Sequence, residues 1–265
     1  MSTQETGRVT QHQEIAPGFY LLTIKAPAIA QLAQPGQFVH VKCTPTMDPL
    51  LRRPISLHGM DAQAGTITLL YQVVGRGTQL LSKFMVNDEI DVMGPLGRGF
   101  TLPNSPGNVV VVGGGIGAAP LLPLVEALCT QGSAVTLILG ARTKEWLLGA
   151  ESFTQAGAQV LVATDDGTQG QHGYVTDILA QQLQGTLPVA LYACGPEPML
   201  KAVANMAAKQ GVTGQVSLEE RMGCGVGACL ACVCKIKVAT ADGWDYQKVC
   251  VDGPVFDLEE VLWSE

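Results

Sequence analysis

Cysteines near the C-terminal end of the chain stand in a spacing that can hold metal. Cys224, Cys229 and Cys232 follow C-x4-C-x2-C order within "MGCGVGACLACVCKI", and Cys250 follows after seventeen intervening residues. This is the plant-type spacing for a [2Fe–2S] cluster with four thiolate ligands. Interspersed glycines let the loop wrap closely, so that backbone N–H groups can donate to sulfur. The spacing therefore predicts an iron–sulfur cluster on these cysteines.

Two other uses of the cysteines are weaker. A structural zinc site usually takes two short knuckles, whereas Cys250 has no close cysteine partner in sequence. Disulfides are rare in a reducing cytoplasm. We expect a cytoplasmic protein, because "MSTQETGRVTQHQEI" lacks a basic region followed by an apolar run. Cys234 points away from Cys232 if "CVCKIKV" is a strand, and no role is predicted for it.

A glycine-rich turn offers a second kind of chemistry. In "VVVVGGGIGAAPLLPLVEAL" a buried strand runs into Gly113, Gly115 and Gly117, and a helix is expected to follow. Backbone amides at such a turn can face a pyrophosphate without obstruction from Cβ atoms. Ala118 stands where the dinucleotide fingerprint has its third glycine. The motif predicts a nucleotide site, and a tight turn that binds nothing is the alternative.

The nicotinamide end of such a site is expected at "YACGPEPMLKAV". Cys194 and Gly195 end a parallel strand there, and ligands of open α/β sheets bind at strand carboxyl ends. Cys194 would lie against the nicotinamide, the alternative being a small buried apolar residue. The second strand ends in "LGARTKE", without the acid that accepts hydrogen bonds from ribose hydroxyls, while Arg142 suits a 2′-phosphate. These residues leave NAD and NADP both open.

A second pyrophosphate clamp is suggested nearer the N-terminus. "LLRRPISLHG" supplies Arg53 and Ser56, and "YQVVGRGTQLLSKF" supplies Gly77 and Thr78 before a short helix. A guanidinium fork beside a glycine turn can hold phosphate. The alternatives are a solvated surface charge at Arg53 and an ordinary hairpin turn at Gly77.

The elements that position these motifs fall into different regions. Residues 8 to about 100 show short strands with period-two alternation, which predicts an antiparallel barrel. We expect the segment 102–108 to be a linker. Continuous apolar strands then alternate with helix-length stretches, which indicates a parallel sheet covered on both faces. We expect domains at 1–101, 107–214 and 215–265.

Composition limits the partners. The net charge is -7 and no Lys/Arg cluster occurs, so we expect no nucleic acid partner. The uncharged run from 109 to 125 contains glycines and two prolines and is shorter than the ~20 apolar residues of a spanning helix. We expect no membrane partner.

Taken together, the motifs resemble the electron-transfer subunits of type B dihydroorotate dehydrogenase, within the ferredoxin reductase-like family. "RRPIS", "GRGTQLLS", "GGGIGAAPLLPL", "ACGPEPML" and "EERMGCGVGACLACVC" occur in the family's order. The resemblance implies an FAD-binding β-barrel, an NAD-binding α/β domain and a small C-terminal 2Fe-2S segment. The family commonly has an aromatic residue where Ile55 stands, and Tyr71 is a candidate substitute for stacking on flavin. The implied FAD contacts are Arg53, Pro54, Ile55, Ser56, Leu70, Tyr71, Gln72, Gly77 and Thr78.

The resemblance also implies an activity, with NADH as the favoured nucleotide. Electrons would pass between NADH, FAD, the cluster and FMN in a separate catalytic subunit that oxidises dihydroorotate to orotate, in a heterotetramer of two plus two. The alternative within this family is an NAD(P)H-linked reductase subunit of a sulfhydrogenase or a ferredoxin-dependent complex. A non-enzymatic redox-sensing or zinc-binding module would need every cofactor motif to be accidental.

Overall fold

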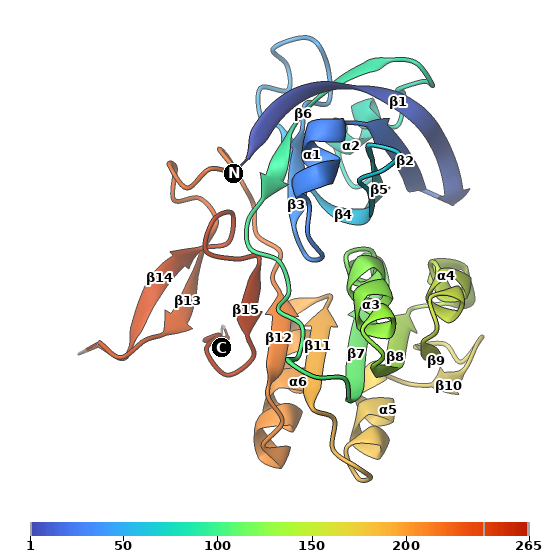
Figure 1. The fold of residues 1–265 in the computed structure, drawn as a ribbon, viewed down its shortest axis with the longest axis vertical. Coiled ribbons are helices and arrows are strands. Elements are labelled where there is room, and N and C mark those ends of the chain that lie inside the picture. Colours follow the sequence, from blue (N-terminus) through green and yellow to red (C-terminus); the bar gives the residue numbers. More distant parts are fainter. Residues whose placement is uncertain (1, 241, 264–265) are drawn as a thin grey trace.

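The computed structural model describes residues 2–240 and 242–263. Its N-terminal part is a closed antiparallel barrel with strand order β1-β2-β5-β4-β3-β6. Helices α1 and α2 lie in connections of this barrel (Figure 1). The element bounds are β1 (Thr3–Ala16), β2 (Phe19–Lys25), α1 (Pro27–Leu32), β3 (Phe38–Val41), β4 (Arg53–Asp61), β5 (Thr66–Gln72), α2 (Arg76–Leu81) and β6 (Glu89–Leu96).

The apolar side chains that alternate along the strands fill the core of this barrel. Alternate side chains, such as Leu22 and Ile24 on β2, are fully buried in its core. Strand β3 is buried on both faces, because Val39 and Val41 fill the barrel while Phe38 faces the rest of the molecule. The predicted antiparallel barrel is confirmed.

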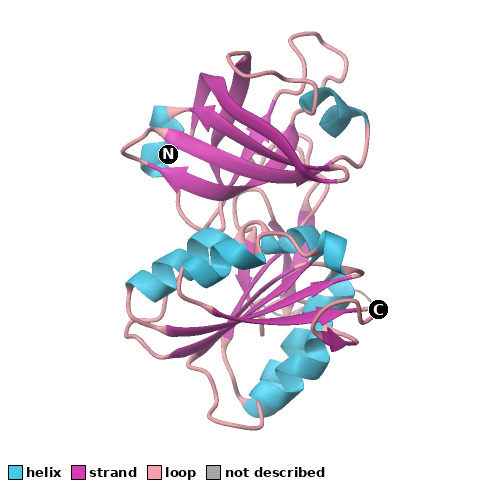
Figure 2. Ribbon diagram, turned by 90° about the vertical axis from the view of Figure 1, so that its right-hand side faces the viewer, coloured by secondary structure: helices cyan, strands magenta, loops and turns pink. Residues whose placement is uncertain are grey.

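The second part is an α/β domain whose sheet has the order β10-β9-β8-β7-β11-β12-β15. Strands β7 to β12 pair in parallel, and helices cover both faces of the sheet (Figure 2). The element bounds are β7 (Asn108–Gly114), η1 (Gly115–Ala118), α3 (Leu121–Thr130), β8 (Ala134–Ala141), η2 (Lys144–Trp146), α4 (Ala150–Gln155), β9 (Gln159–Thr164), β10 (Gln171–His172), α5 (Val175–Gln182), β11 (Ala190–Cys194), α6 (Glu197–Gln210) and β12 (Gly214–Ser217). In the described part of the chain, no helix is long and apolar enough to cross a membrane.

The C-terminal segment is tied into this sheet. It forms a hairpin of β13 (Val233–Lys237) and β14 (Trp244–Lys248), and then β15 (Val255–Asp257) pairs antiparallel with β12 (Figure 1). The sheet therefore continues past residue 214, where the sequence analysis placed a domain boundary. An apolar core also joins the three parts, because Phe38 of the barrel, Ile138 of the sheet and Cys250 belong to the same buried cluster.

Candidate functional site

The cysteine loop between β12 and β13 holds its thiols in two pairs, the second completed by Cys250 after β14. Cys224 and Cys229 are hydrogen-bonded, with the Cys224 N–H donating to Cys229 Sγ at 3.4 Å. Cys232 and Cys250 are both buried and hydrogen-bonded to each other through their side chains. The pairs are close enough for Cys224 to act electrostatically on Cys250. A cluster of two irons with four thiolates needs two on each iron, and this pairing fits the predicted ligand set.

Backbone N–H groups in the same loop point at sulfur. Val226 and Ala228 donate to Cys224 Sγ at 3.4 and 3.3 Å, and Gly225 has a φ of +72°. These bonds, led by that from Val226, lower the pKa of the Cys224 thiol to about 6. Such donors favour thiolate and fit a bound iron–sulfur group. Within residues 2–240 and 242–263, no three His, Cys, Asp or Glu side chains already form a site for a metal ion.

A cavity of about 400 Å³ opens where the barrel meets the other two parts. Some of the residues in its walls were not predicted from the sequence. They come from the turn after β7 and from the C-terminal segment, and they include Ile116, Met222 and Pro254. Apolar walls with a few polar groups fit a flavin ring. Most of the residues carried over from the family line the cavity: Pro54, Ile55, Ser56, Leu70, Tyr71, Gln72 and Thr78.

Arg53 and Gly77 meet beside this cavity. A Cβ at Gly77 would clash with Nε of Arg53, so the guanidinium packs directly on the glycine backbone. The Nη1 atom of Arg53 donates to the Leu51 carbonyl at 2.6 Å, which holds the side chain in place. The fold thus brings together the two halves of the predicted phosphate clamp, and a charged fork beside bare backbone fits a diphosphate.

Two neighbouring side chains hold the aromatic ring of Tyr71 in place. It stacks on Tyr20 with ring centroids 5.7 Å apart, and its hydroxyl is 2.9 Å from His12 Nε2. Burial raises the pKa of the Tyr71 hydroxyl. A neutral ring held in position in the cavity wall could stack on the flavin, and this role of Tyr71 stays a prediction.

A larger cavity of about 720 Å³ lies at the carboxyl ends of β7, β8 and β11. Gly115, Gly117 and Gly195 line it, in agreement with a dinucleotide site. Gly113 stands behind the wall, where a Cβ would meet Leu139 at 3.1 Å. The turn after β7 is the 3-10 helix η1, and the α-helix expected after the glycines begins later, with α3.

Two residues of opposite charge line this cavity. Arg142 follows β8 and packs over the Trp146 ring at 5.6 Å, and Asp165 follows β9, the next strand of the sheet. Sequence reasoning missed Asp165 because it looked for an acid at the end of the second strand. The signal was "ATDDG", since carboxyl ends of neighbouring parallel strands meet at one edge. Asp165 can accept hydrogen bonds from ribose hydroxyls.

Cys194 lies behind the cavity wall. The residue is 1% exposed and packs in the core of the α/β domain, while the adjacent Gly195 lines the cavity. Burial chiefly raises the pKa of the Cys194 thiol, nearby Glu219 raises it further, and a hydrogen bond with Ser217 opposes both. The thiol is therefore protonated, and its approach to a nicotinamide stays a prediction.

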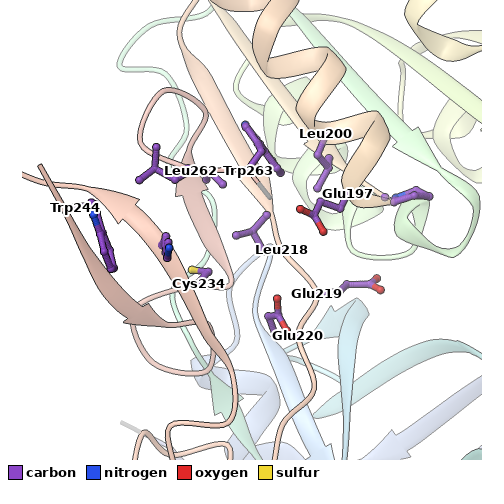
Figure 3. Close-up of a pocket in the computed structure, with 13 residues that line it drawn as sticks. Glu197, Leu200, Leu218, Glu219, Glu220, Cys234, Trp244, Leu262 and Trp263 are labelled. Carbon is purple, nitrogen blue, oxygen red and sulfur yellow. The ribbon is translucent and has the colours of Figure 1, made fainter. Parts of the chain in front are cut away.

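The segment after β12 is shared by several cavities. Glu219 lines both cavities described above, and also a third of about 690 Å³ between α6 and the β13–β14 hairpin. Figure 3 shows Glu219 and Glu220 on this segment, with Glu197 on the α6 side and Cys234 and Trp244 on the hairpin side. The Glu219 side chain is open to cavity space, and the protein around it raises the pKa of its carboxyl by desolvation.

Cys234 belongs to this third cavity. Its Sγ donates to the Gln247 carbonyl across the hairpin at 3.6 Å, and burial chiefly raises the pKa of its thiol to about 12. A protonated thiol engaged with the hairpin agrees with its exclusion from the predicted ligand set.

Similarity to known proteins follows the same division of the chain. A model for the iron–sulfur cluster binding domain of dihydroorotate dehydrogenase B matches residues 219–262, and a model for the oxidoreductase NAD-binding domain matches residues 111–205. The dihydroorotate dehydrogenase B (NAD(+)) electron transfer subunit of Desulforamulus reducens is 47% identical over 94% of this chain and 95% of its own length. The chain belongs to this family of electron transfer subunits. The family member from Geobacillus sp. strain WCH70 is 44% identical over 99% of this chain and 100% of its own length.

Solved structures place the family within a broader fold. The structure of an NADH-dependent reduced ferredoxin–NADP oxidoreductase, studied for flavin-based electron bifurcation, has a TM-score of 0.85 and 34% identity over 98% of this chain and 90% of its own. A ferredoxin reductase of carbazole 1,9a-dioxygenase has a TM-score of 0.68 and 22% identity over 80% of this chain and 67% of its own, which shows the shared fold. Membership of the dihydroorotate dehydrogenase B subunit family confirms the predicted cofactors FAD, a 2Fe-2S cluster and NAD(H).

Proposed function

We propose that this chain is the electron-transfer subunit of an NAD-dependent dihydroorotate dehydrogenase. The observation that carries the proposal is the order of its sites. Gln72, Ile116 and Glu219 line both the 720 Å³ and the 400 Å³ cavity, so the candidate sites for NAD(H) and FAD adjoin. Met222, two residues before Cys224, also lines the smaller cavity. These shared and neighbouring residues support a candidate flavin site that adjoins both of the other sites.

The residues of the chain hold and orient the groups. Arg53 and Gly77 hold the diphosphate of FAD, Gly115 and Gly117 give a nicotinamide dinucleotide close access to backbone, and the four predicted cysteine ligands bind iron. When bound, the nicotinamide supplies a hydride, the flavin couples two-electron to one-electron chemistry, and the cluster carries single electrons. The apolar cavity walls keep water from the flavin ring.

The proposal includes a separate catalytic partner. The family's name implies such a subunit, and the sites described occupy the 265 residues of this chain, whereas an FMN-bearing (β/α)8 barrel takes about 250 residues of its own. We propose an FMN-containing partner that oxidises dihydroorotate in pyrimidine biosynthesis, in a heterotetramer of two plus two.

The proposed location of the complex is the cytoplasm. A reducing compartment keeps cysteine side chains as free thiols. Free thiols are also what assembly of an iron–sulfur cluster requires, because the ligands of the cluster are thiolates.

A second candidate is a reductase subunit of a ferredoxin-dependent complex. The 34% identical ferredoxin–NADP oxidoreductase, which matches 98% of this chain, favours it. The 47% identity to a dihydroorotate dehydrogenase B subunit favours the first proposal.

The test is an anaerobic visible and EPR spectrum of the chain co-purified with an FMN-barrel partner, before and after NADH. Flavin bleaching, a reduced 2Fe-2S signal and conversion of orotate to dihydroorotate are expected. Cofactor reduction without orotate turnover, but with reduction of added ferredoxin, would assign the chain to the second candidate. The partner alone with NADH is the control, and orotate turnover there would remove the need for this chain.

A further inference from the structure

A histidine lies where the barrel meets the cysteine loop. His40 stands on β3, two residues after Phe38, with their rings 6.2 Å apart in an edge-to-face arrangement. Since Val39 and Val41 point into the barrel, His40 points out of it, as Phe38 does. Phe38 belongs to a buried cluster formed mostly by the α/β domain and the C-terminal segment, so this face of β3 is turned toward those two parts.

The ring of His40 packs against the backbone of the cysteine loop. A Cβ at Gly225 would stand 2.7 Å from His40 Nδ1 and 2.9 Å from Cε1. Gly225 directly follows Cys224. The imidazole therefore lies between the barrel and the candidate iron-binding loop, in a contact that the missing side chain at residue 225 allows.

Neither ring nitrogen of His40 has a partner among the described residues. The side chain is 0% exposed, and both Nδ1 and Nε2 lack a hydrogen bond. Two other histidines differ, because His12 contacts the Phe84 carbonyl and His58 contacts the Ala119 carbonyl. Buried polar groups without a partner are rare and indicate an absent ligand or a functional role.

The ring is neutral in this position. Burial, with smaller effects of the nearby Arg52 and Arg53 guanidinium groups, lowers the pKa of the His40 imidazole to about 4. A neutral imidazole keeps one N–H to donate. Sulfur that carries negative charge, on the loop side, accepts hydrogen bonds from its surroundings.

We propose that His40 donates a ring N–H to the sulfur of the iron–sulfur group held by the cysteine loop, as a positioning residue that sets the potential of that group. The proposal rests on the proposed function, because it requires the cluster. It gives the barrel, as well as the cysteine loop, a part in tuning the cluster. Loss of a donor to sulfur leaves negative charge uncompensated, which makes the cluster harder to reduce.

The test uses the holoprotein labelled with 15N-histidine and reduced with dithionite. Pulsed EPR of the reduced cluster should show a 15N coupling that is lost in His40→Leu and retained in His172→Gln, a change at an exposed residue of β10. Redox titration should place the potential of His40→Leu below that of the native chain. His40→Gln, which keeps an N–H donor, should fall between them.

The outcomes separate this proposal from the proposed function. If the native protein contained no iron when purified, the proposed function itself would be contradicted. A full cluster without 15N coupling in the native chain would overturn the role of His40, and this result needs no variant to fold. A coupling that survives in His40→Leu, or a potential equal to the native one in that variant, would overturn it as well.

Discussion

The guanidinium of Arg53 packs on the backbone of Gly77, although the two residues belong to different elements of the barrel. Arg53 begins β4 and Gly77 lies in the first turn of α2, where a Cβ would meet Nε of Arg53. Neither residue forms the candidate phosphate clamp alone. The position of the charge depends on the absence of a side chain at residue 77.

Arg53→Ala should weaken FAD binding about tenfold or more, since charge-assisted hydrogen bonds contribute roughly 1.5–3 kcal/mol. Gly77→Ala should act in the same direction, because its methyl group displaces the guanidinium. FAD retained after gel filtration, and the Kd from flavin fluorescence, measure both. Arg76→Ala is the control, since its ion pair with Asp48 is exposed at 65% and 71%. If Arg53→Ala bound FAD with native affinity, Arg53 would be only a solvated surface charge.

Gly117→Ala should slow flavin reduction by NADH at least about tenfold, while FAD and iron stay bound, because the loss of one or two backbone contacts to the nucleotide is of order 1.4 kcal/mol. A Cβ at Gly117 would stand 2.6 Å from the Gly195 backbone, so the turn or β11 must shift at the nucleotide cavity. Stopped-flow reduction of the flavin is the measurement. Gly185→Ala, where the nearest atom is 3.9 Å away, is the matched control. Native reduction rates in Gly117→Ala would remove this turn from the nucleotide site.

Cys229→Ser should lose most of its iron and the visible absorbance of the cluster, because a serine hydroxyl is a poorer iron ligand than a thiolate. FAD should remain bound, since the walls of the flavin cavity come from other residues. Iron analysis and the absorbance spectrum measure the change. Cys234→Ser is the control, because Cys234 engages the Gln247 carbonyl. Iron loss from the control with full iron in Cys229→Ser would exchange the two assignments.

Asp165→Ala should raise KM for NADH several-fold with little change in kcat, because ribose contacts are equal in the ground state and the transition state. Arg142→Ala should leave NADH kinetics near native, since NADH has no 2′-phosphate for it to bind. Steady-state diaphorase assays with NADH and NADPH measure both variants. A native chain that uses NADPH more efficiently than NADH, with that preference lost in Arg142→Ala, would instead indicate an NADP-linked enzyme.

We expect the contact between the barrel and the nucleotide domain to be sensitive to acid through His58. Its Nδ1 lies 2.8 Å from the Ala119 carbonyl, and burial lowers the pKa of the imidazole from 6.5, against a smaller raising effect of that hydrogen bond. The unfolded chain therefore binds a proton more readily, so stability present above pH 6.5 is lost as pH falls. His58→Gln should flatten part of this decline in Tm between about pH 7.5 and 5.5. Parallel curves for both proteins would exclude His58 as the cause.

Secondary-structure elements and candidate iron ligands could be predicted from the sequence better than the residues that line several cavities at once. Alternation in the barrel and continuous apolar strands afterwards follow from local burial, so both regions could be recognised. The candidate iron ligands could be named from their spacing alone. By contrast, Glu219 was missed as a cavity residue, because it reaches three cavities only once the segment after β12 has been placed beside the barrel. His40 on a barrel strand gave no signal for the same reason, since its contact with Gly225 joins distant parts of the chain.

The pairing of β15 with β12 constrains how this protein is made. Residues 255–257 leave the ribosome after the cysteine loop, and until they do so β12 is an edge strand with open hydrogen-bonding groups. Iron capture by the loop and protection of this edge therefore belong to the same late stage of synthesis. A nascent chain that stalls after the cysteine loop but before β15 would leave β12 unpaired and exposed to aggregation, even though its barrel could already have folded.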